Sequence, residues 1–153
     1  LTQAFSWEVL MKLLLLFMFI FLSSCNSPTQ KLAPIPNSDS HKAAFPQTPY
    51  SAKYYWAKGP YGEVDKENTL VVFLYKNQEL HSLPSDLSIE FYATMPSMGH
   101  PLEDAGYFQE LSPGIYINEH IKYNMSGEWK NELQIMNSAF NIQDKISWSE
   151  FLQ

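Results

Sequence analysis

Apolar and polar residues alternate along the chain beyond residue 50, with the period of two that is typical of β-strands rather than the 3.6 of a helix. The clearest run covers residues 87–95, in which every odd position is apolar and most even positions are polar. Each such run predicts a strand with one buried face. The other predicted inward positions are Ile115, Ile117, Ile121, Tyr123 and Met125, then Trp129, Leu133 and Ile135, then Phe140, Ile142, Ile146 and Trp148.

Three further strands and the turns between them complete the expected fold. Residues 70–75 are apolar throughout, which suits a central strand, and residues 54–56 and 107–108 predict two short aromatic strands. Ser112-Pro113-Gly114 is the clearest hairpin turn, and residues 106–135 are expected to hold three consecutive antiparallel strands. With no convincing helix, the pattern predicts an all-β domain, an immunoglobulin-like antiparallel β-sandwich of about seven strands.

The N-terminal region predicts export. Met11 and Lys12 precede a ten-residue apolar run and then Ser23, Ser24 and Cys25. A membrane-spanning helix needs about 20 apolar residues, so this shorter run predicts a signal peptide that is removed. We place the signal peptide at residues 1–24 and interpret residues 1–10 as lying upstream of the true start.

Leu22-Ser23-Ser24-Cys25 resembles the lipobox of bacterial lipoproteins, in which the cysteine is acylated and becomes the first mature residue. The alternative is a free cysteine in a signal sequence that is cut elsewhere. Acylation would anchor the protein firmly, because each buried methylene contributes about 0.8 kcal/mol. The resemblance implies a periplasm-facing position on the bacterial cell envelope, and Asn26, where lipoproteins retained in the inner membrane have Asp, favours the outer membrane.

Residues 25–50 are rich in proline, serine and other polar residues. Such a composition buries too little apolar area to offset the entropy of ordering, so it predicts a disordered tether between the lipid and a domain at residues 51–153. The net charge is −6, and all ten positive residues are lysine. An acidic chain without arginine is a poor match for nucleic acid, and we exclude that class of partner.

Three short motifs follow one another in the second half of the chain: MPSMGH at residues 95–100, glycine–tyrosine strands at 106–107 and 114–116, and YNMSGEW at 123–129. Their order and spacing resemble the YtkA-like domain family, a bacterial immunoglobulin-like group related to FixH, over about residues 70–135. The resemblance implies an exported or membrane-facing β-sandwich, often encoded near copper handling or oxidase assembly, with no established catalytic activity. Residues 101–103, Pro-Leu-Glu, replace the glycine or histidine that often follows the loop, which leaves the number of metal ligands open.

The MPSMGH segment also carries soft metal ligands. Thioether sulfur and imidazole without a thiolate suit Cu(I) better than zinc, magnesium or calcium. We therefore expect copper ligands at Met98 and His100. Met95 and Met125 each end a predicted strand, and they would be a third and a fourth ligand if these two strand ends lie at the same end of the sandwich. Packing is the alternative for Met95 and Met125, which continue inward strand phases, and His100 could instead cap a turn.

Two carboxylates, Glu119 and Asp144, interrupt predicted inward faces, but no histidine or nucleophile accompanies them in a catalytic arrangement. We expect no enzyme activity. The leading hypothesis is a lipid-anchored copper protein that serves copper handling or delivery to a respiratory or envelope partner. The alternative is a β-sandwich scaffold without metal that docks to another envelope protein.

Overall fold

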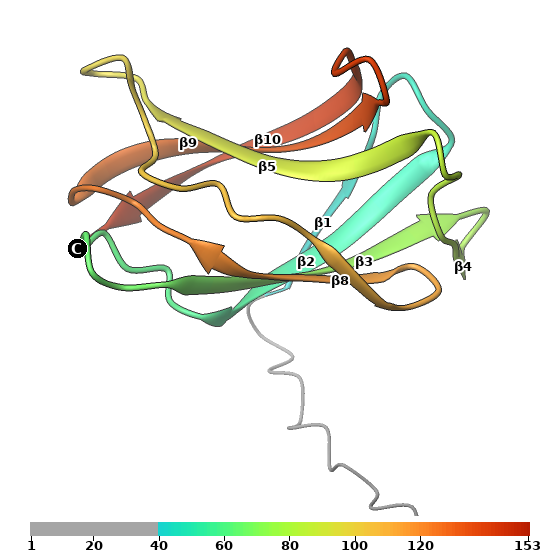
Figure 1. The fold of residues 1–153 in the computed structure, drawn as a ribbon, viewed down its shortest axis with the longest axis horizontal. Coiled ribbons are helices and arrows are strands. Elements are labelled where there is room, and N and C mark those ends of the chain that lie inside the picture. Colours follow the sequence, from blue (N-terminus) through green and yellow to red (C-terminus); the bar gives the residue numbers. More distant parts are fainter. Residues whose placement is uncertain (1–39) are drawn as a thin grey trace, which may run out of the picture. The chain divides into compact units, whose positions relative to one another are not determined.

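Two antiparallel β-sheets packed face to face make up residues 40–153, the part of the chain that the computed structural model describes (Figure 1). The first sheet contains β1 (His41–Ala44), β2 (Tyr50–Lys58), β3 (Asn68–Lys76), β4 (Glu79–Leu80), β7 (Gln109–Ser112) and β8 (Ile115–Ile121). The second contains β5 (Leu87–Met95), β6 (His100–Pro101), β9 (Gly127–Asn137) and β10 (Ile142–Leu152). The predicted all-β sandwich is confirmed, with ten strands instead of about seven.

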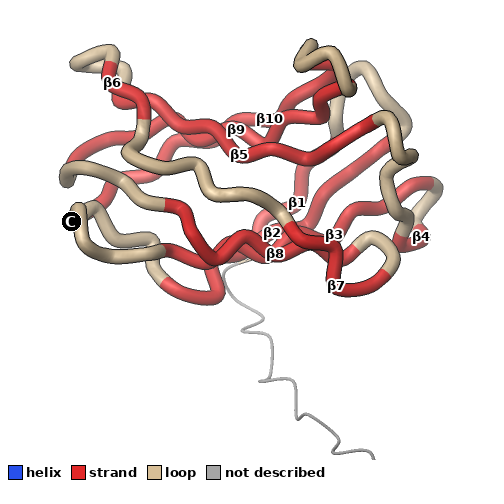
Figure 2. Tube along the Cα trace, viewed as in Figure 1, coloured by secondary structure: helices blue, strands red, loops and turns tan. Residues whose placement is uncertain are grey.

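The order of the strands is that of an immunoglobulin domain. The first sheet runs β1-β2-β3-β8-β7 with β4 also paired to β3, and the second runs β10-β9-β5-β6. Strands β2-β3-β8-β7 match the A-B-E-D sheet, and β5-β9-β10 match the C-F-G sheet. Within residues 106–135, β7 and β8 pair as predicted through the Pro113-Gly114 turn, whereas β9 crosses to the other sheet. Between residues 40 and 153 no helix is long and apolar enough to cross a membrane, and Figure 2 shows only strands and loops.

Side chains from the inner faces of both sheets form one core. The alternation predicted for β5 is confirmed, because Ile89, Phe91, Ala93 and Met95 are all buried. Trp129, at the start of β9, is fully buried, as predicted for a core anchor at that corner. Burying a large apolar side chain contributes about 1.5–3 kcal/mol, so this aromatic and aliphatic layer stabilises the domain without a disulfide.

The prediction of which side chains face the core is wrong for the first half of β8. Tyr116 and Asn118 point into the core, and Ile115 and Ile117 are half-buried on the outer face. A shift in the β3–β8 register after Asn118 then returns Ile121 to the inner face. Both faces of this strand are partly apolar, so alternation alone could not decide between them. The predicted strand at residues 107–108 is also wrong, because β7 begins at Gln109.

The folded domain begins earlier than predicted. Residues 41–50, which we assigned to the tether, contain β1 and two core side chains, Phe45 and Tyr50, which are 3% and 6% exposed. The amide of Phe45 donates to the carbonyl of Tyr50 at 3.0 Å and closes the loop between β1 and β2. The prolines of this loop therefore belong to a turn of the sandwich. The predicted signal peptide, Cys25 and the rest of the tether lie outside the described residues.

Candidate functional site

The MPSMGH segment is a hairpin between β5 and β6. Pro96 to Gly99 form its turn, in which the amides of Met98 and Gly99 donate to the carbonyl of Met95 at 3.2 and 2.8 Å. Gly99 has a φ of 67°, a left-handed conformation that glycine adopts without strain. His100 then pairs with Met95 in the first register position of the hairpin. The local sequence therefore presents Met98 at a tight turn and His100 at the start of a short edge strand.

The four predicted copper ligands differ in their access to solvent. Met98 is 56% exposed and His100 is also exposed, as expected for residues beyond the inward phase of β5. Met95 is 3% exposed within the core cluster, and Met125 is partly buried against the same cluster. The packing interpretation thus describes Met95, whereas Met98 and His100 are free to meet a ligand.

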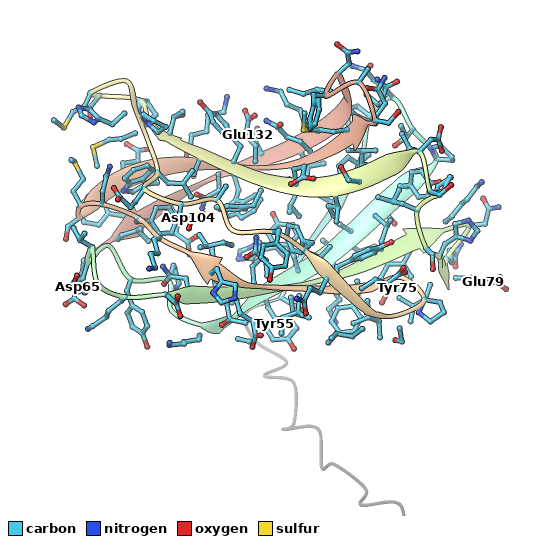
Figure 3. The ribbon with its side chains drawn as sticks, in the orientation of Figure 1. Tyr55, Asp65, Tyr75, Glu79, Asp104 and Glu132 are labelled. Carbon is cyan, nitrogen blue, oxygen red and sulfur yellow. The ribbon has the colours of Figure 1, made fainter. Side chains whose placement is uncertain are left out.

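Contacts between the β5–β6 hairpin and the connection from β8 to β9 place Met125 at the same end of the sandwich as the hairpin. Asn124 donates from Nδ2 to the carbonyl of Pro101 at 3.4 Å. A Cβ atom built on Gly127 would lie 2.8 Å from Cε of Met95, so the Met95 side chain packs directly on this corner. Figure 3 shows sulfur atoms, in yellow, at the left end of the domain. The two corners therefore adjoin, as the ligand hypothesis for Met125 requires.

The backbone of Met125 is held in place independently of its sulfur. Its carbonyl accepts a hydrogen bond from the indole Nε1 of Trp129 at 3.1 Å. Among residues 40–153, no three His, Cys, Asp or Glu side chains are grouped so that they could hold a metal ion. A metal site at this corner would therefore depend on thioether sulfur, together with the one imidazole of His100.

The two carboxylates considered for acid–base chemistry do not come together. Glu119 is exposed on β8 in the first sheet, whereas Asp144 is 2% exposed on β10 in the second. Oδ2 of Asp144 accepts hydrogen bonds from the amides of Gln47 and Thr48 at 2.7 and 2.6 Å. Asp144 thus holds the β1–β2 loop, which is a structural role.

A third carboxylate, Glu150, lies at the centre of a polar network that the sequence interpretation missed. Its Oε2 accepts hydrogen bonds from Nε1 of Trp56 at 2.9 Å and from Nδ2 of Asn131 at 3.1 Å. Burial, followed by the charge of Glu150, raises the pKa of Tyr54 to about 12 and holds the pKa of Tyr123 well above its usual value. The alternation of Ile146, Trp148 and Leu152 would have placed Glu150 inward. Among the described residues its hydrogen-bond donors are Trp56, Asn131 and Trp148, so the network orients aromatic core side chains.

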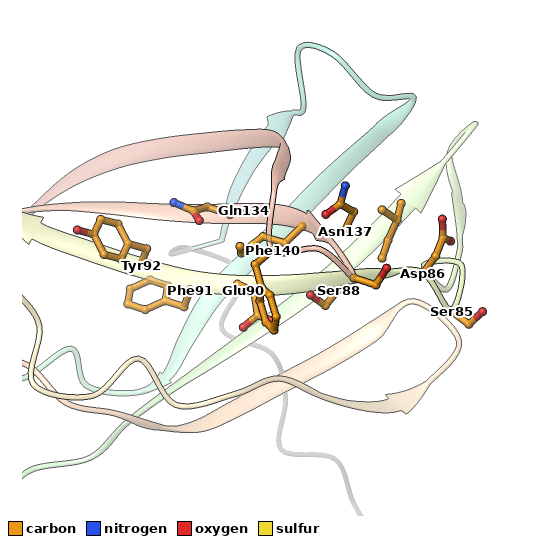
Figure 4. Close-up of a pocket in the computed structure, with 12 residues that line it drawn as sticks. Ser85, Asp86, Ser88, Glu90, Phe91, Tyr92, Gln134, Asn137 and Phe140 are labelled. Atoms are coloured by element: carbon orange, nitrogen blue, oxygen red, sulfur yellow. The ribbon is translucent and has the colours of Figure 1, made fainter.

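A hollow of the described surface lies over β5 and β9, beside the turn that joins β9 to β10 (Figure 4). It has a volume of about 520 Å³, and Tyr92, Glu90, Asp86 and Phe140 are among the side chains that line it. Phe140 and Ile142 were predicted to point inward, but they are 85% and 50% exposed, because Phe140 lies in the turn and Ile142 only begins β10. Phe140 has a φ of 59°, which is rare for a bulky residue. Its turn is closed by Oδ1 of Asn137, which accepts two backbone amides. The turn therefore fixes an aromatic side chain in solvent.

No family model, no curated protein and no solved structure matches the chain.

Proposed function

We propose that the protein is a lipid-anchored envelope protein with a YtkA-like immunoglobulin domain, and that it binds Cu(I) for copper handling or for delivery to a respiratory or envelope partner. The observation that carries the proposal is the position of Met98 and His100. Both side chains are exposed on the β5–β6 hairpin, which is joined to the Met125 corner by the Asn124–Pro101 hydrogen bond. Soft and borderline donors in one exposed place suit Cu(I).

The proposed ligands are Met98 and His100, which are exposed, and Met125, which is partly buried. Met95 contributes through packing, because its thioether would have to leave the core cluster to bind a metal. A flexible, unbranched side chain such as Met98 can exchange its bond to copper for one from a partner protein. An exposed site of this kind suits transfer of copper better than permanent storage.

Anaerobic titration with Cu(I), using a competing chromophoric chelator, tests the proposal. Wild-type protein is expected to take up one copper ion, and Met98→Ala/His100→Ala, which removes two of the proposed ligands, to bind at least about tenfold more weakly, which corresponds to about 1.4 kcal/mol of binding free energy. The matched control is Met136→Ala/His81→Ala, which removes the same residue types from outside the hairpin. X-ray absorption should show both sulfur and nitrogen neighbours. Equal binding by the two double variants would exclude the hairpin as the copper site.

A second function, docking to another envelope protein, is favoured by Phe140. This exposed aromatic ring stands beside a hollow whose lining includes Asp86 and Glu90 and no lysine. Exposed aromatic anchors are frequent in the centre of protein interfaces. Charge complementarity points to a partner segment that carries lysine or arginine next to an apolar side chain.

Two labelled peptides test this docking function. We expect an alternating lysine–leucine peptide to bind wild-type protein and to bind Phe140→Ser more weakly. A glutamate–leucine peptide of the same length should not bind. Ile142→Ser, which changes another exposed apolar residue nearby in the sequence, is the matched control. Equal binding of both peptides, or undiminished binding of the lysine–leucine peptide by Phe140→Ser, would contradict the docking function.

A further inference from the structure

A second hollow, of about 440 Å³, lies on the outer face of the first sheet, over β1, β2 and β3. All six side chains that line it offer hydrogen-bond donors, two of them are positively charged, and none is acidic. They are Ser40, Lys42, Ser51, Lys53, Tyr75 and Gln78. In a chain with a net charge of −6, this lining is a local concentration of groups that favour an anion.

The two lysines are placed against each other. Lys42 and Lys53 are direct partners in the β1–β2 register, an arrangement in which like charges repel and destabilise the pair of strands. Neither lysine forms an ion pair with a carboxylate of the described residues, whereas Lys66, Lys122, Lys130 and Lys145 do. An anion between the two ammonium groups would convert this repulsion into attraction.

The turn between β3 and β4 adds an independent sign of a binding role. Asn77 and Gln78 form a two-residue hairpin turn with φ values of 53° and 69°. The second position of such a turn is normally glycine, because a side chain is strained there. The sequence instead keeps a glutamine, whose amide side chain contributes to the hollow. Strain retained at one position is frequent where a residue contacts a ligand.

We propose that this hollow binds a phosphate group. Lysine ammonium groups act as point charges for phosphate, and the hydroxyls of Ser51 and Tyr75 and the amide of Gln78 can donate to its oxygens. The group can belong to the headgroup of an anionic phospholipid or to free phosphate, since the recognising chemistry is shared. The hollow borders β1, the first strand after the segment that we expect to carry the acyl anchor.

Binding is measured on the mature chain, residues 25–153, with Cys25→Ser, so that neither the apolar signal peptide nor acyl groups hold it on membranes. One arm titrates inorganic phosphate and follows backbone amide shifts at Lys42 and Lys53. The other arm sediments the protein with phosphatidylcholine vesicles that do or do not contain phosphatidylglycerol. Binding only to the phosphatidylglycerol vesicles would identify a headgroup as the source, and binding of inorganic phosphate would identify a free anion.

Removing the two ammonium groups is the decisive comparison. We expect Lys42→Gln/Lys53→Gln to weaken binding of the phosphate probe by about thirtyfold, from the contribution of two lysines near an anionic surface. Its melting temperature should not fall, because the substitution removes a repulsive pair. Lys58→Gln/Lys66→Gln makes the same change in net charge outside the hollow and should have little effect.

The proposal is overturned if neither probe binds, or if the two double-lysine variants lose the same affinity, which would indicate unspecific attraction. Met98→Ala/His100→Ala should retain phosphate binding, because its hairpin belongs to the other sheet. The phosphate site and the copper site can therefore fail or succeed separately.

Discussion

Met95 and His100 are register partners that close the β5–β6 hairpin, yet Met95 is 3% exposed and His100 is exposed to solvent. Their exposure differs because the inner face of β5 packs in the core as far as Met95, whereas β6 is a short strand at the edge of the sheet. One end of the MPSMGH segment thus serves the core and the other is available for binding. This division gives the variants of the segment different expected effects.

Replacing Met95 should change stability and leave copper binding intact. Met95→Ala removes a buried side chain and should lower the free energy of unfolding by about 2–5 kcal/mol, whereas Met95→Leu conserves volume and should cost less than about 1.5 kcal/mol. Urea denaturation measures both effects. Cu(I) titration of Met95→Leu should match that of wild type. A tenfold loss in this variant would instead make Met95 a ligand.

Gly127 and Met95 should be energetically coupled. Gly127 has a φ of 133°, and a Cβ there would lie 2.8 Å from Cε of Met95, so Gly127→Ala combines backbone strain with a clash. We expect it to destabilise the domain by more than about 1 kcal/mol. In Gly127→Ala/Met95→Ala the clash is absent and the backbone strain remains, so the double variant should be more stable than the sum of the single effects predicts. Strict additivity would refute this contact.

The sequence predicted those parts of the fold that local patterns determine. The alternation of β5, the burial of Trp129 and the turn at Pro113-Gly114 all follow from residues near to one another in the chain. The core-facing side of β8 was predicted wrongly because both faces of the strand carry apolar side chains, Tyr116 on one and Ile115 and Ile117 on the other. Alternation alone does not tell which of two apolar faces is buried. The four-residue strand β1 was missed because its loop depends on Asp144, which lies 97 residues from Gln47.

The candidate sites show the same limit. Met98 and His100 became candidate ligands because a proline and the end of the inward-facing alternation of β5 separate them from the core. The opposition of Lys42 and Lys53 depends on how β1 pairs with β2, which no local pattern states. Glu150 could have been placed inward from its neighbours, but its indole and amide partners come from two other strands.

Asp144 should be needed to hold the β1–β2 loop. Asp144→Ala leaves the amides of Gln47 and Thr48 without their acceptor and should lower the free energy of unfolding by about 1–3 kcal/mol. Hydrogen exchange at these two amides should become faster. Glu119→Ala, which removes an exposed carboxylate, should change stability by less than about 0.5 kcal/mol. Similar effects of the two substitutions would argue against the assigned role of Asp144.

Cys25 lies outside the described residues, and its expected acylation gives a separate prediction. Cys25→Ser should abolish acylation, and once the signal peptide is removed the variant should be soluble, because it lacks acyl chains that contribute about 0.8 kcal/mol for each buried methylene. Metabolic labelling with a fatty acid should mark wild type only. Ser24→Ala, which keeps a small residue before the cysteine, should remain acylated. Membrane association of Cys25→Ser without label would show that another interaction holds the protein.

The tyrosines beside Glu150 should make stability fall at alkaline pH. The pKa of Tyr54 is raised from 10.0 to about 12, mainly by burial and then by the charge of Glu150. Between these pH values the unfolded chain loses a proton that the folded chain retains, so the free energy of unfolding decreases as pH rises. The contribution of Tyr54 is about 2–3 kcal/mol, from 1.36 kcal/mol for each pKa unit. It is fully present below pH 10 and is lost by about pH 12.

Glu150→Gln tests the cause of this shift. Without the carboxylate charge the pKa of Tyr54 should fall, so the phenolate absorbance should appear at lower pH than in wild type, and the alkaline loss of stability should be smaller. Glu128→Gln removes an exposed carboxylate from the neighbouring strand and should leave the phenolate titration unchanged. Identical titration curves for the two variants would mean that burial alone raises the pKa of Tyr54. A lower pKa in Glu150→Gln alone would locate the electrostatic part of the effect at the carboxylate that binds Trp56 and Asn131.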